Sequence, residues 1–459
     1  MKNKYLRVRE VLLNFLKDER NLSLYVLSIM FVTLLGYRFN QTIGMIILIL
    51  ISSVILFFTN DLAYIIPSAS YILFMISTPF SSYRVPIELI ITASIFIVVL
   101  IIYTIINGFN ITKLKSLIWA LPMAISTLLP IIWYKPVNST ENFYYFLYFG
   151  DLLYLAIYMV ICNGIKSNSF NILVQTMSKL GILLFLESVI CVLKYAIPGE
   201  SILDLWYYLG WGLCNEAGIM MCFSLPFSFY LISKSKNAKE LIINNFTVIL
   251  TLMGVLLTTS RGSYIFASAI TGVSYFALFV FSKNKKRNCI IGGIVFGFVL
   301  LFVVIFSKQI ISMISHILSI VFELGLDDHG RFWLWNKAWN LYTDNIRNIF
   351  FGPGICCYIT QIFNAYGFQR GPMVFHSTFF ETLATGGLIG LFILLIHFIK
   401  KYTMIHKHDK QLFIFLLIGF IFVDLYGLID NTYHMFYYMI PLSIVFASFD
   451  SDDYIIKNR

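Results

Sequence analysis

Long apolar segments separated by short polar connectors recur along the whole 459-residue chain. Each segment approaches the ~20 residues that a helix needs to cross a bilayer. Inside lipid a helix satisfies its own backbone donors and acceptors, whereas an open sheet edge does not. We therefore predict an all-α polytopic membrane protein with about 12–14 transmembrane helices. The candidate spans are residues 23–38, 42–59, 61–79, 87–107, 116–134, 144–164, 179–197, 216–233, 241–259, 263–281, 289–307, 376–399, 411–427 and 431–449.

The same pattern divides the chain into four parts. Residues 1–22 mix charged and apolar positions and lack a small-residue cleavage site, so we expect an interfacial cytoplasmic segment and not a signal peptide. Residues 23–307 contain the expected helices 1 to 11, and residues 308–375 form a long extracytoplasmic loop. Residues 376–459 contain the expected helices 12 to 14 and a cytoplasmic tail.

Composition and charge support this organisation and orient it. Hydrophobic residues make up 59% of the chain, charged residues 12%, and the mean hydropathy is +0.82, which excludes a water-soluble domain. The net charge is +10, but the basic residues are dispersed, so we expect no nucleic-acid binding. Most of the 33 lysines and arginines, including Lys179 and Lys401, fall in alternate connectors. Because cytoplasmic loops retain positive charge, both termini are predicted to be cytoplasmic.

Arginine prevails over lysine on the predicted outer face. A guanidinium group presents a planar fork of donors that matches phosphate and carboxylate oxygens. Arg261 stands in the short turn Thr258–Gly262, where Ser260 adds a hydroxyl donor, and Arg331 and Arg370 lie in the long loop. These residues predict an anion-binding site, with anchoring to lipid headgroups as the alternative.

The residues after Arg331 carry apolar side chains at helical spacing from Phe332 to Tyr342. This spacing predicts an amphipathic helix lying on the membrane surface. The segment Asn348–Gly354, with its Gly-Pro-Gly sequence, is expected to end the helix in a turn.

His376 stands at the outer end of a predicted span, where a histidine can act as a base at neutral pH. Glu381 follows it in the same span and is predicted to bind substrate, and Gly386 and Gly387 let neighbouring helices approach closely. A purely structural interfacial histidine is the alternative. A divalent metal held by His376 with the contiguous Asp327–His329 is a weaker alternative, because that spacing is not specific for a metal and the acidic pair suits a helix cap. We expect no metal and no cofactor.

Four more polar residues are predicted on the outer face as substrate-binding groups. Asn215 and Glu216 begin the eighth span, where a helix cap is an equal alternative. Asp430 and His434 lie one helical turn apart at the start of the last span, where a buried structural pair is the favoured alternative.

Four motifs in the second half of the chain together resemble the bacterial O-antigen ligases and the O-antigen and capsule polysaccharide polymerases. They are Cys214–Gly218, Leu257–Ser263, His329–Trp335 with Gly352–Gly354, and His376–Gly390. Two positions depart from the pattern of that family, which often has proline at Asn348 and asparagine at Ser377.

The resemblance implies a C-type, metal-independent, inverting glycosyltransferase of the hexosyltransferase kind. It implies an undecaprenyl-diphosphate-linked oligosaccharide as donor, with Arg261 and Arg331 on the diphosphate and His376 serving the acceptor hydroxyl. The expected location is the bacterial inner membrane, with the active site facing the periplasm or the outside. Membrane lipids are expected partners, and a flippase and a chain-length regulator are candidate partners.

Within the family, a polymerase joins lipid-linked repeat units, whereas an O-antigen ligase transfers the glycan to a lipopolysaccharide core or to a protein. We favour the polymerase because polymerases are the more numerous class, and we keep the ligase as the alternative. A lipid-linked oligosaccharide flippase is a less favoured third possibility. It should carry charges deep in its bundle, where Glu187 and Asp424 are the main acidic residues.

Overall fold

The computed structural model describes most of the chain. The described residues are 2–76, 87–132, 142–195, 214–258, 260–281, 285–288, 290, 292–294, 297, 331–354, 359–364, 367–372, 375–406, 409–433 and 436–457. The helices of the first half are α1 (Lys2–Lys17), α2 (Glu19–Phe39), α3 (Gln41–Thr59), α4 (Ile66–Ile76), α5 (Ile87–Ile106), α6 (Leu117–Leu128), α7 (Asn142–Gly164) and α8 (Phe170–Tyr195), with 3-10 turns η1 (Leu62–Ile65), η2 (Ile111–Lys113) and η3 (Leu129–Ile132). The elements of the second half are α9 (Cys214–Lys234), α10 (Ala238–Leu257), α11 (Arg261–Phe281), α14 (Arg331–Thr343), α15 (Ile346–Phe351), β1 (Ile359–Asn364), β2 (Gly367–Pro372), α16 (Thr378–Ile405), α17 (Lys410–Tyr426) and α18 (Phe436–Lys457).

Several helices begin at a polar residue whose side chain caps the first turn. Asp18 accepts from the backbone N–H groups of Arg20 and Asn21 before α2, and Asn40 accepts from Ile43 before α3. Asp409 accepts from the first turn of α17 in the same way. Because the first N–H groups of a helix have no partner within it, these caps define where one apolar helix ends and the next begins.

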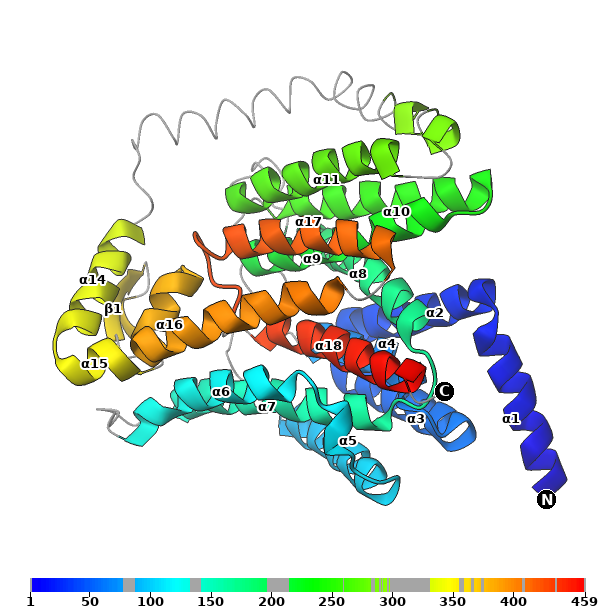
Figure 1. Cartoon of the computed structure of the whole chain (residues 1–459), viewed down its shortest axis with the longest axis horizontal. Coiled ribbons are helices and arrows are strands. Elements are labelled where there is room, and N and C mark those ends of the chain that lie inside the picture. Colours follow the sequence, from blue (N-terminus) through cyan, green and yellow to red (C-terminus); the bar gives the residue numbers. More distant parts are fainter. Residues whose placement is uncertain are drawn as a thin grey trace.

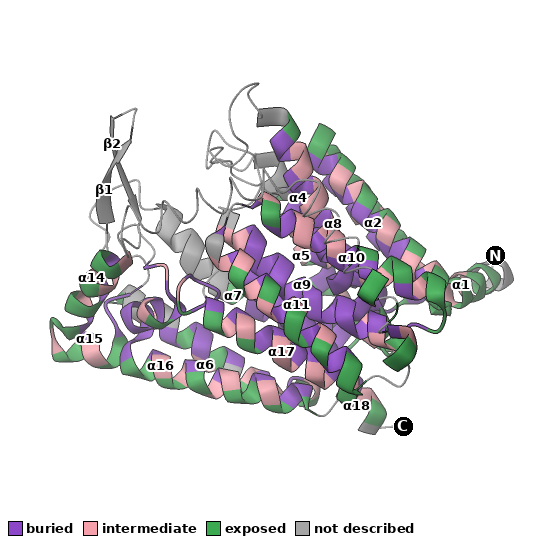
Figure 2. Cartoon of the chain, turned by 90° about the horizontal axis from the view of Figure 1, so that it is seen from above, coloured by how far each residue is buried: buried purple, intermediate pink, exposed green. Residues whose placement is uncertain are grey.

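The helices pack into a bundle with α9 near its centre. Buried residues gather on the inner helices, and exposed residues lie on outward faces (Figure 2). In α9, 83% of the apolar, membrane-length part of the helix is buried, whereas in α11 the corresponding share is 28%. Large apolar side chains such as Phe31, Phe276 and Phe392 are exposed on the outer helices. An exposed apolar surface of this extent fits contact with lipid.

Within the described residues, seven helices are long and apolar enough to cross a membrane. They are Glu19–Phe39, Gln41–Thr59, Phe170–Leu193, Asn215–Lys234, Ala238–Leu257, Gly262–Phe281 and Thr378–Ile405, and shorter apolar helices cover Leu62–Met75, Ser94–Ile106 and Leu152–Gly164. The prediction of an all-α membrane protein is confirmed. The total of about 12–14 spans stays a prediction, and most of residues 289–307 lie outside the described part.

Two lysines that the sequence analysis assigned to connectors lie inside helices. Lys179 is buried within α8, where its ammonium group donates to Gln175 one turn earlier. Lys401 is fully buried within α16 and donates to both carboxylate oxygens of Asp424 at 2.6 Å. The connector assignment of both was wrong, because a hydropathy window records a polar side chain but not the partner that allows its burial.

Helix α16 is bent and does not run straight. Gly387 has φ +60° and ψ −153°, far from helical values, and Figure 1 shows α16 as two arms. The Oγ1 atom of Thr378 lies 3.1 Å from that of Thr432, while Lys401 donates to the hydroxyl of the next residue, Tyr433. In a straight helix residues 378 and 401 would be about 35 Å apart. Their contacts with consecutive residues therefore mean that the two arms turn back toward each other.

The bend is filled by the turn that follows α15. The backbone N–H of Gly354 donates to the carbonyl of Ala384 at 2.7 Å. A Cβ atom on Gly352 would lie 2.7 Å from the backbone nitrogen of Gly386, and one on Gly387 would lie 2.5 Å from the carbonyl carbon of Phe350. The predicted role in close approach is thus confirmed for Gly387, although the approaching segment is a turn, whereas a Cβ atom on Gly386 would make only an ordinary contact with Ser126 at 3.5 Å.

The outer loop contains two helices and a hairpin. Helix α14 begins at Arg331, as the sequence indicates, and α15 ends at Phe351 before the positive-φ residue Gly352. Strands β1 and β2 form an antiparallel pair with Ile359 opposite Pro372. This hairpin was not predicted from the sequence, and within the described residues it is the only sheet.

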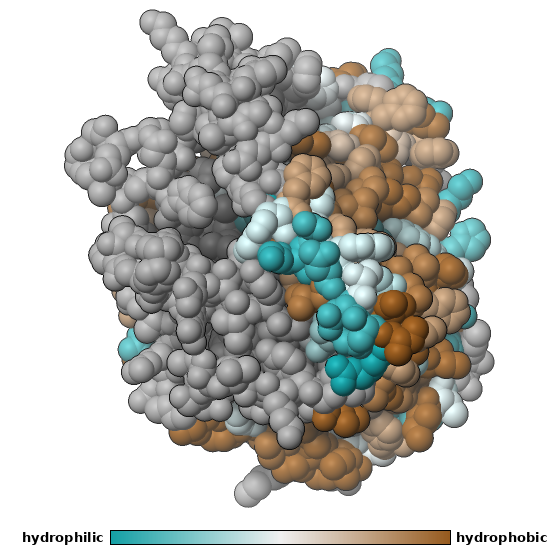
Figure 3. Space-filling view, turned by 90° about the vertical axis from the view of Figure 1, so that its left-hand side faces the viewer, coloured by the Kyte–Doolittle hydropathy of each residue, from teal (hydrophilic) through white to brown (hydrophobic). Residues whose placement is uncertain are grey.

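The loop elements and the two termini lie at opposite ends of the bundle (Figure 1). The end with α14 and α15 is turned toward the viewer in Figure 3, where hydrophilic side chains form a patch bordered by hydrophobic ones. This arrangement fits termini on one side of a membrane and the loop on the other. Which side is cytoplasmic remains the prediction made from the charged connectors.

Candidate functional site

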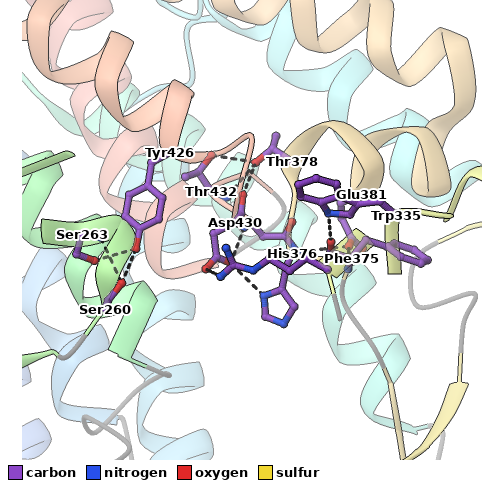
Figure 4. A network of polar contacts seen from close by, with 12 residues as sticks. Ser260, Ser263, Trp335, Phe375, His376, Thr378, Glu381, Tyr426, Asp430 and Thr432 are labelled. Carbon is purple, nitrogen blue, oxygen red and sulfur yellow. Dashed lines mark hydrogen bonds and ion pairs between the residues drawn. The ribbon is translucent and has the colours of Figure 1, made fainter. Parts of the chain in front are cut away.

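The candidate site centres on His376, which directly precedes α16. Its Nδ1–H donates to Oδ1 of Asp430 at 3.2 Å, and the side chain of His376 is 27% exposed (Figure 4). On the other side of the carboxylate, Nη2 of Arg331 lies 3.8 Å from Oδ2 of Asp430, and the Arg331 side chain is 28% exposed. An imidazole, a guanidinium and a carboxylate from three separate segments therefore meet at one accessible point.

Asp430 is held in place by the turn between α17 and α18. Its carboxylate accepts from the backbone N–H of Asn431 at 2.8 Å, and its carbonyl accepts from the backbone N–H of Thr378. The N–H of Thr378 also donates to the carbonyl of Gly427, and the Thr378 hydroxyl accepts from the N–H of Thr432. The first turn of α16 is therefore fastened to the turn that carries Asp430 (Figure 4).

The charges around His376 act in opposite directions. Burial alone lowers the pKa of His376, whereas the hydrogen bond and the negative charge of Asp430 raise it. Arg331 lowers the pKa and Glu216 raises it, and the outcome is a pKa above the usual 6.5. His376 is thus a stronger base than an isolated histidine, because its protonated form is stabilised by a carboxylate.

The turn before α11 reaches the same region through Tyr426, at the end of α17. The hydroxyl groups of Ser260 and Ser263 each lie 2.8 Å from the Tyr426 hydroxyl. A Cβ atom on Gly262 would lie 2.7 Å from the Tyr426 ring, so glycine allows this close packing. The backbone of Arg261 therefore begins α11 against the helix that leads to Asp430.

Glu381 and the α9 residues occupy different surroundings. Glu381 is buried, and its Oε2 accepts from the backbone N–H of Phe375 at 2.9 Å and from Nδ2 of Asn431 at 3.3 Å. Asn215 and Glu216 lie in the first turn of α9, half-buried, and the charge of Glu216 acts on His376. The structure thus brings Glu216 toward the site, while Glu381 supports its backbone.

Three predicted residues are described incompletely or not at all. For Arg261 and Arg370, the description covers the backbone only: Arg261 is the first residue of α11, and Arg370 lies in β2 opposite Gln361. His434 lies outside the described residues. The favoured partner of Asp430 was His434, but the described partners of its carboxylate are His376, Arg331 and Asn431.

The weaker metal hypothesis cannot be built from the described residues. Among them, no group of three or more histidines, cysteines or acidic residues is arranged to hold a metal ion. Asp327, Asp328 and His329, which that hypothesis required, lie outside the described part.

Two residues of the site were not singled out from the sequence. Trp335 donates from Nε1 to the carbonyl of Phe375 at 2.9 Å, and Tyr426 bridges Ser260 and Ser263. The only signal for Trp335 was its place in the His329–Trp335 motif, where it was interpreted as part of an amphipathic face. Tyr426 gave no signal, because an aromatic residue at the end of an apolar helix is common.

Comparison with known proteins identifies the segment that carries most of this geometry. The model of the family described as O-antigen ligase matches residues 246–395, which include Ser260, Arg261, Arg331, His376 and Glu381. No curated protein matches the chain. Asp430 and Tyr426 lie beyond the matched segment, and Glu216 lies before it. Residues 246–395 of this multi-pass membrane protein thus match the family described as O-antigen ligase.

Proposed function

We propose that the protein is an O-antigen or capsule polysaccharide polymerase. It transfers a glycan from an undecaprenyl-diphosphate-linked donor to a lipid-linked repeat unit at the outer face of the cytoplasmic membrane. The observation that carries the proposal is the contact of Asp430 with both His376 and Arg331 in an accessible position. A base beside an anion-binding cation is what transfer from a diphosphate to a hydroxyl requires.

In this mechanism His376 removes the proton of the acceptor hydroxyl. Its Nδ1–H is held by Asp430, which orients the ring and stabilises the imidazolium that forms, as an aspartate does in a catalytic triad. The acceptor oxygen then forms a bond to C1 of the donor sugar while the bond from C1 to the diphosphate oxygen breaks. Attack from the side opposite the leaving group inverts the configuration at C1.

Arginine groups stabilise the leaving diphosphate. Among the described residues, the ion-pair partner of Arg331 is Asp430 at the long distance of 3.8 Å, so its guanidinium retains donors for phosphate oxygens. Arg261 begins α11 near the same site and is proposed as the second diphosphate ligand, with Arg370 and Ser260 as further contacts. Asn215, Glu216, Asp430 and His434 are proposed near the sugar or the acceptor. Removing one donor of this kind typically lowers the rate by ~10²–10³.

Ligase activity is the alternative, favoured by the description of the matched family as O-antigen ligase. A flippase has less support. The deep carboxylate of Asp424, which could serve an ion-coupled transporter, is already bound to Lys401 on both oxygens. A carboxylate closed in this way has little capacity to bind and release an ion.

Purified protein incubated with its lipid-diphosphate repeat unit, in detergent and without an ion gradient, tests the proposal. The expected product is a ladder of sizes differing by one repeat. A single glycan on a different acceptor would identify a ligase instead, and the absence of any new glycosidic bond would contradict both.

A matched pair of arginine variants sharpens this test. Arg331→Ala should abolish most of the ladder, whereas Arg347→Ala, which changes an exposed arginine of the same loop, should leave it intact. Equal ladders from the two variants would contradict the role of Arg331.

A further inference from the structure

Two side chains hold the backbone of Phe375, the residue before His376. One binds its N–H group and the other binds its carbonyl. The backbone N–H of Phe375 donates to the carboxylate of Glu381, and the carbonyl of Phe375 accepts from Nε1 of Trp335, each at 2.9 Å. Phe375 itself is fully buried. Backbone groups of a loop are usually satisfied by other backbone groups or by water, so two side-chain partners on one residue are an unusual restraint.

His376 explains why such a restraint is needed. It has φ +47°, in the left-handed region that residues other than glycine seldom adopt, although histidine, like asparagine and aspartate, does so more often than most. A conformation of this kind costs ~1–3 kcal/mol and persists only where the surroundings enforce it. Trp335 holds the peptide plane between Phe375 and His376, and Glu381 holds the peptide group before it. The bond from Thr378 to Gly427 fixes the backbone just after His376.

Trp335 also connects this backbone with the arginine of the site. Arg331 and Trp335 are one turn apart on α14, so their side chains extend from the same face of the helix. The Trp335 ring stacks on Phe380 at a centroid distance of 5.3 Å, and Leu334 and Ala338 pack with Phe375 and Ala384. Helix α14 therefore cannot shift without changing both Arg331 and the carbonyl of Phe375.

We propose that Trp335 is a positioning residue that holds the base and the leaving-group ligand in one geometry, and that Glu381 completes the restraint from α16. This inference rests on the proposed function. Glu381 serves here by linking Phe375 to Asn431, the neighbour of Asp430, and not by contacting substrate. Without the Trp335 bond, His376 can move away from Asp430. The charged groups that act on the pKa of His376 in the intact site are Asp430, Arg331 and Glu216.

Trp335→Phe is the sharpest test, because it keeps an aromatic ring against Phe380 and removes only the N–H donor. Trp333→Phe is the matched control, since Trp333 is an exposed residue of the same helix. For Trp335→Phe we expect kcat to fall roughly 3- to 10-fold, the effect of losing one hydrogen bond from the transition-state geometry. KM for the donor should change little, and the acid limb of the pH–rate profile should move to lower pH as His376 loses its contact with Asp430.

Two results would overturn the inference. One is a Trp335→Phe enzyme whose kcat and pH profile match those of Trp333→Phe. The other is a variant with a lower melting temperature but an unchanged kcat per folded molecule and an unchanged acid limb, which would mean that Trp335 is only structural. His376→Ala measured in parallel separates the two proposals: if it is inactive and Trp335→Phe is normal, only the positioning role fails.

A second pair of variants tests the other side of the restraint. Glu381→Gln keeps an oxygen that accepts from Phe375 and should retain most of the activity. Glu381→Ala removes the acceptor and should show the same fall in kcat and the same shift of the acid limb as Trp335→Phe. Equal activity of the glutamine and alanine variants would contradict the role of Glu381.

Discussion

Asp424 and Asp430 lie close together in the sequence, but they differ in the distance and the exposure of the cations that they contact. Asp424 receives Lys401 at 2.6 Å on both oxygens, and Lys401 is wholly buried. Asp430 receives His376 at 3.2 Å and Arg331 at 3.8 Å, and both of these side chains are more than a quarter exposed. Both carboxylates are largely buried, but the partner of Asp424 is buried as well, whereas the two cations beside Asp430 are accessible to a further ligand.

On the proposed function, this difference separates a structural ion pair at Asp424 from a functional one at Asp430. Lys401 donates to Asp424 and to the Tyr433 hydroxyl, and Tyr402 also donates to Asp424, so this cluster is satisfied internally. A buried pair of this kind is costly to break because removal of one partner strands a charge. At Asp430 the contacts are longer, and on the proposed function both cations serve the substrate. The predictions below test that distinction.

The largest effect is expected from His376→Ala. Removal of a general base typically lowers the rate by ~10²–10⁴. The measurement is the initial rate of glycan transfer by purified protein. His406→Ala is the control, since His406 is an exposed histidine after α16 that lies against Phe413. If the two variants retain similar rates, His376 is not the base.

Lys401→Met should act on stability and not on chemistry. Removing one partner of a buried ion pair typically costs ~3–5 kcal/mol, so the melting temperature in detergent should fall markedly. The double variant Lys401→Met with Asp424→Leu should recover much of the loss, because no buried charge is then left alone. Two results would contradict a purely structural role for the pair: a Lys401→Met protein with an unchanged melting temperature, or one that folds normally but loses turnover.

Gly387→Ala tests whether the bend in α16 supports the open site. The backbone at Gly387 lies in a region that is essentially restricted to glycine, and a Cβ atom would meet Phe350 at 2.5 Å. We expect a loss of ~1–3 kcal/mol or more in stability. Gly386→Ala is the control, because its Cβ atom would find only Ser126 at 3.5 Å, an ordinary contact. Similar melting temperatures for the two variants would contradict the bend.

The smallest effect is expected from Glu216→Gln. In the wild-type protein the base form of His376 should increase as pH rises through a pKa above 6.5, so the acid limb of the rate profile should lie above that value. Loss of the Glu216 charge removes one influence that raises this pKa, so the limb should move to lower pH. Asp430→Asn should move it further in the same direction. A limb that moves upward in either variant would reverse the assigned electrostatics.

The same pKa sets the sign of one contribution to stability. Because the pKa of His376 is higher in the folded protein than its usual value, the protonated histidine favours folding. This contribution is complete below pH 6.5 and is lost as the pH rises through the folded-state pKa. The protein should therefore be slightly less stable where the base is most active.

Much of the helical architecture followed from the sequence because apolar segments of membrane length have few alternatives in lipid. The residues Arg331, His376 and Asp430 were also identified singly, since charged groups beside apolar spans are costly unless they have a role. The family resemblance implied that Arg331 and His376 share one site, but their meeting at Asp430 could not be predicted. His376 and Asp430 are 54 residues apart, and nothing in a single sequence encodes which distant partner a carboxylate will find.

Two further features were not predicted, namely the backbone conformation of Gly387 and the burial of Lys401 beside Asp424. Gly387 looked like a small residue in a straight span, but its positive φ turns α16 back on itself. Lys401 looked like a topological charge, because hydropathy scores it as polar whether or not Asp424 is beside it. In both cases the local sequence is compatible with two structures, and long-range packing decides between them.

The position of Asp430 has a consequence for the order of synthesis. The matched family segment ends at residue 395, yet the carboxylate that orients His376 arrives only with the turn after α17. A nascent chain that has inserted α16 already contains Arg331 and His376. His376 then lacks its hydrogen bond to Asp430, and the first turn of α16 lacks its bonds to Gly427 and Asp430. On the proposed function, the growing protein should therefore be inactive toward lipid-linked sugars until α17 is in the membrane.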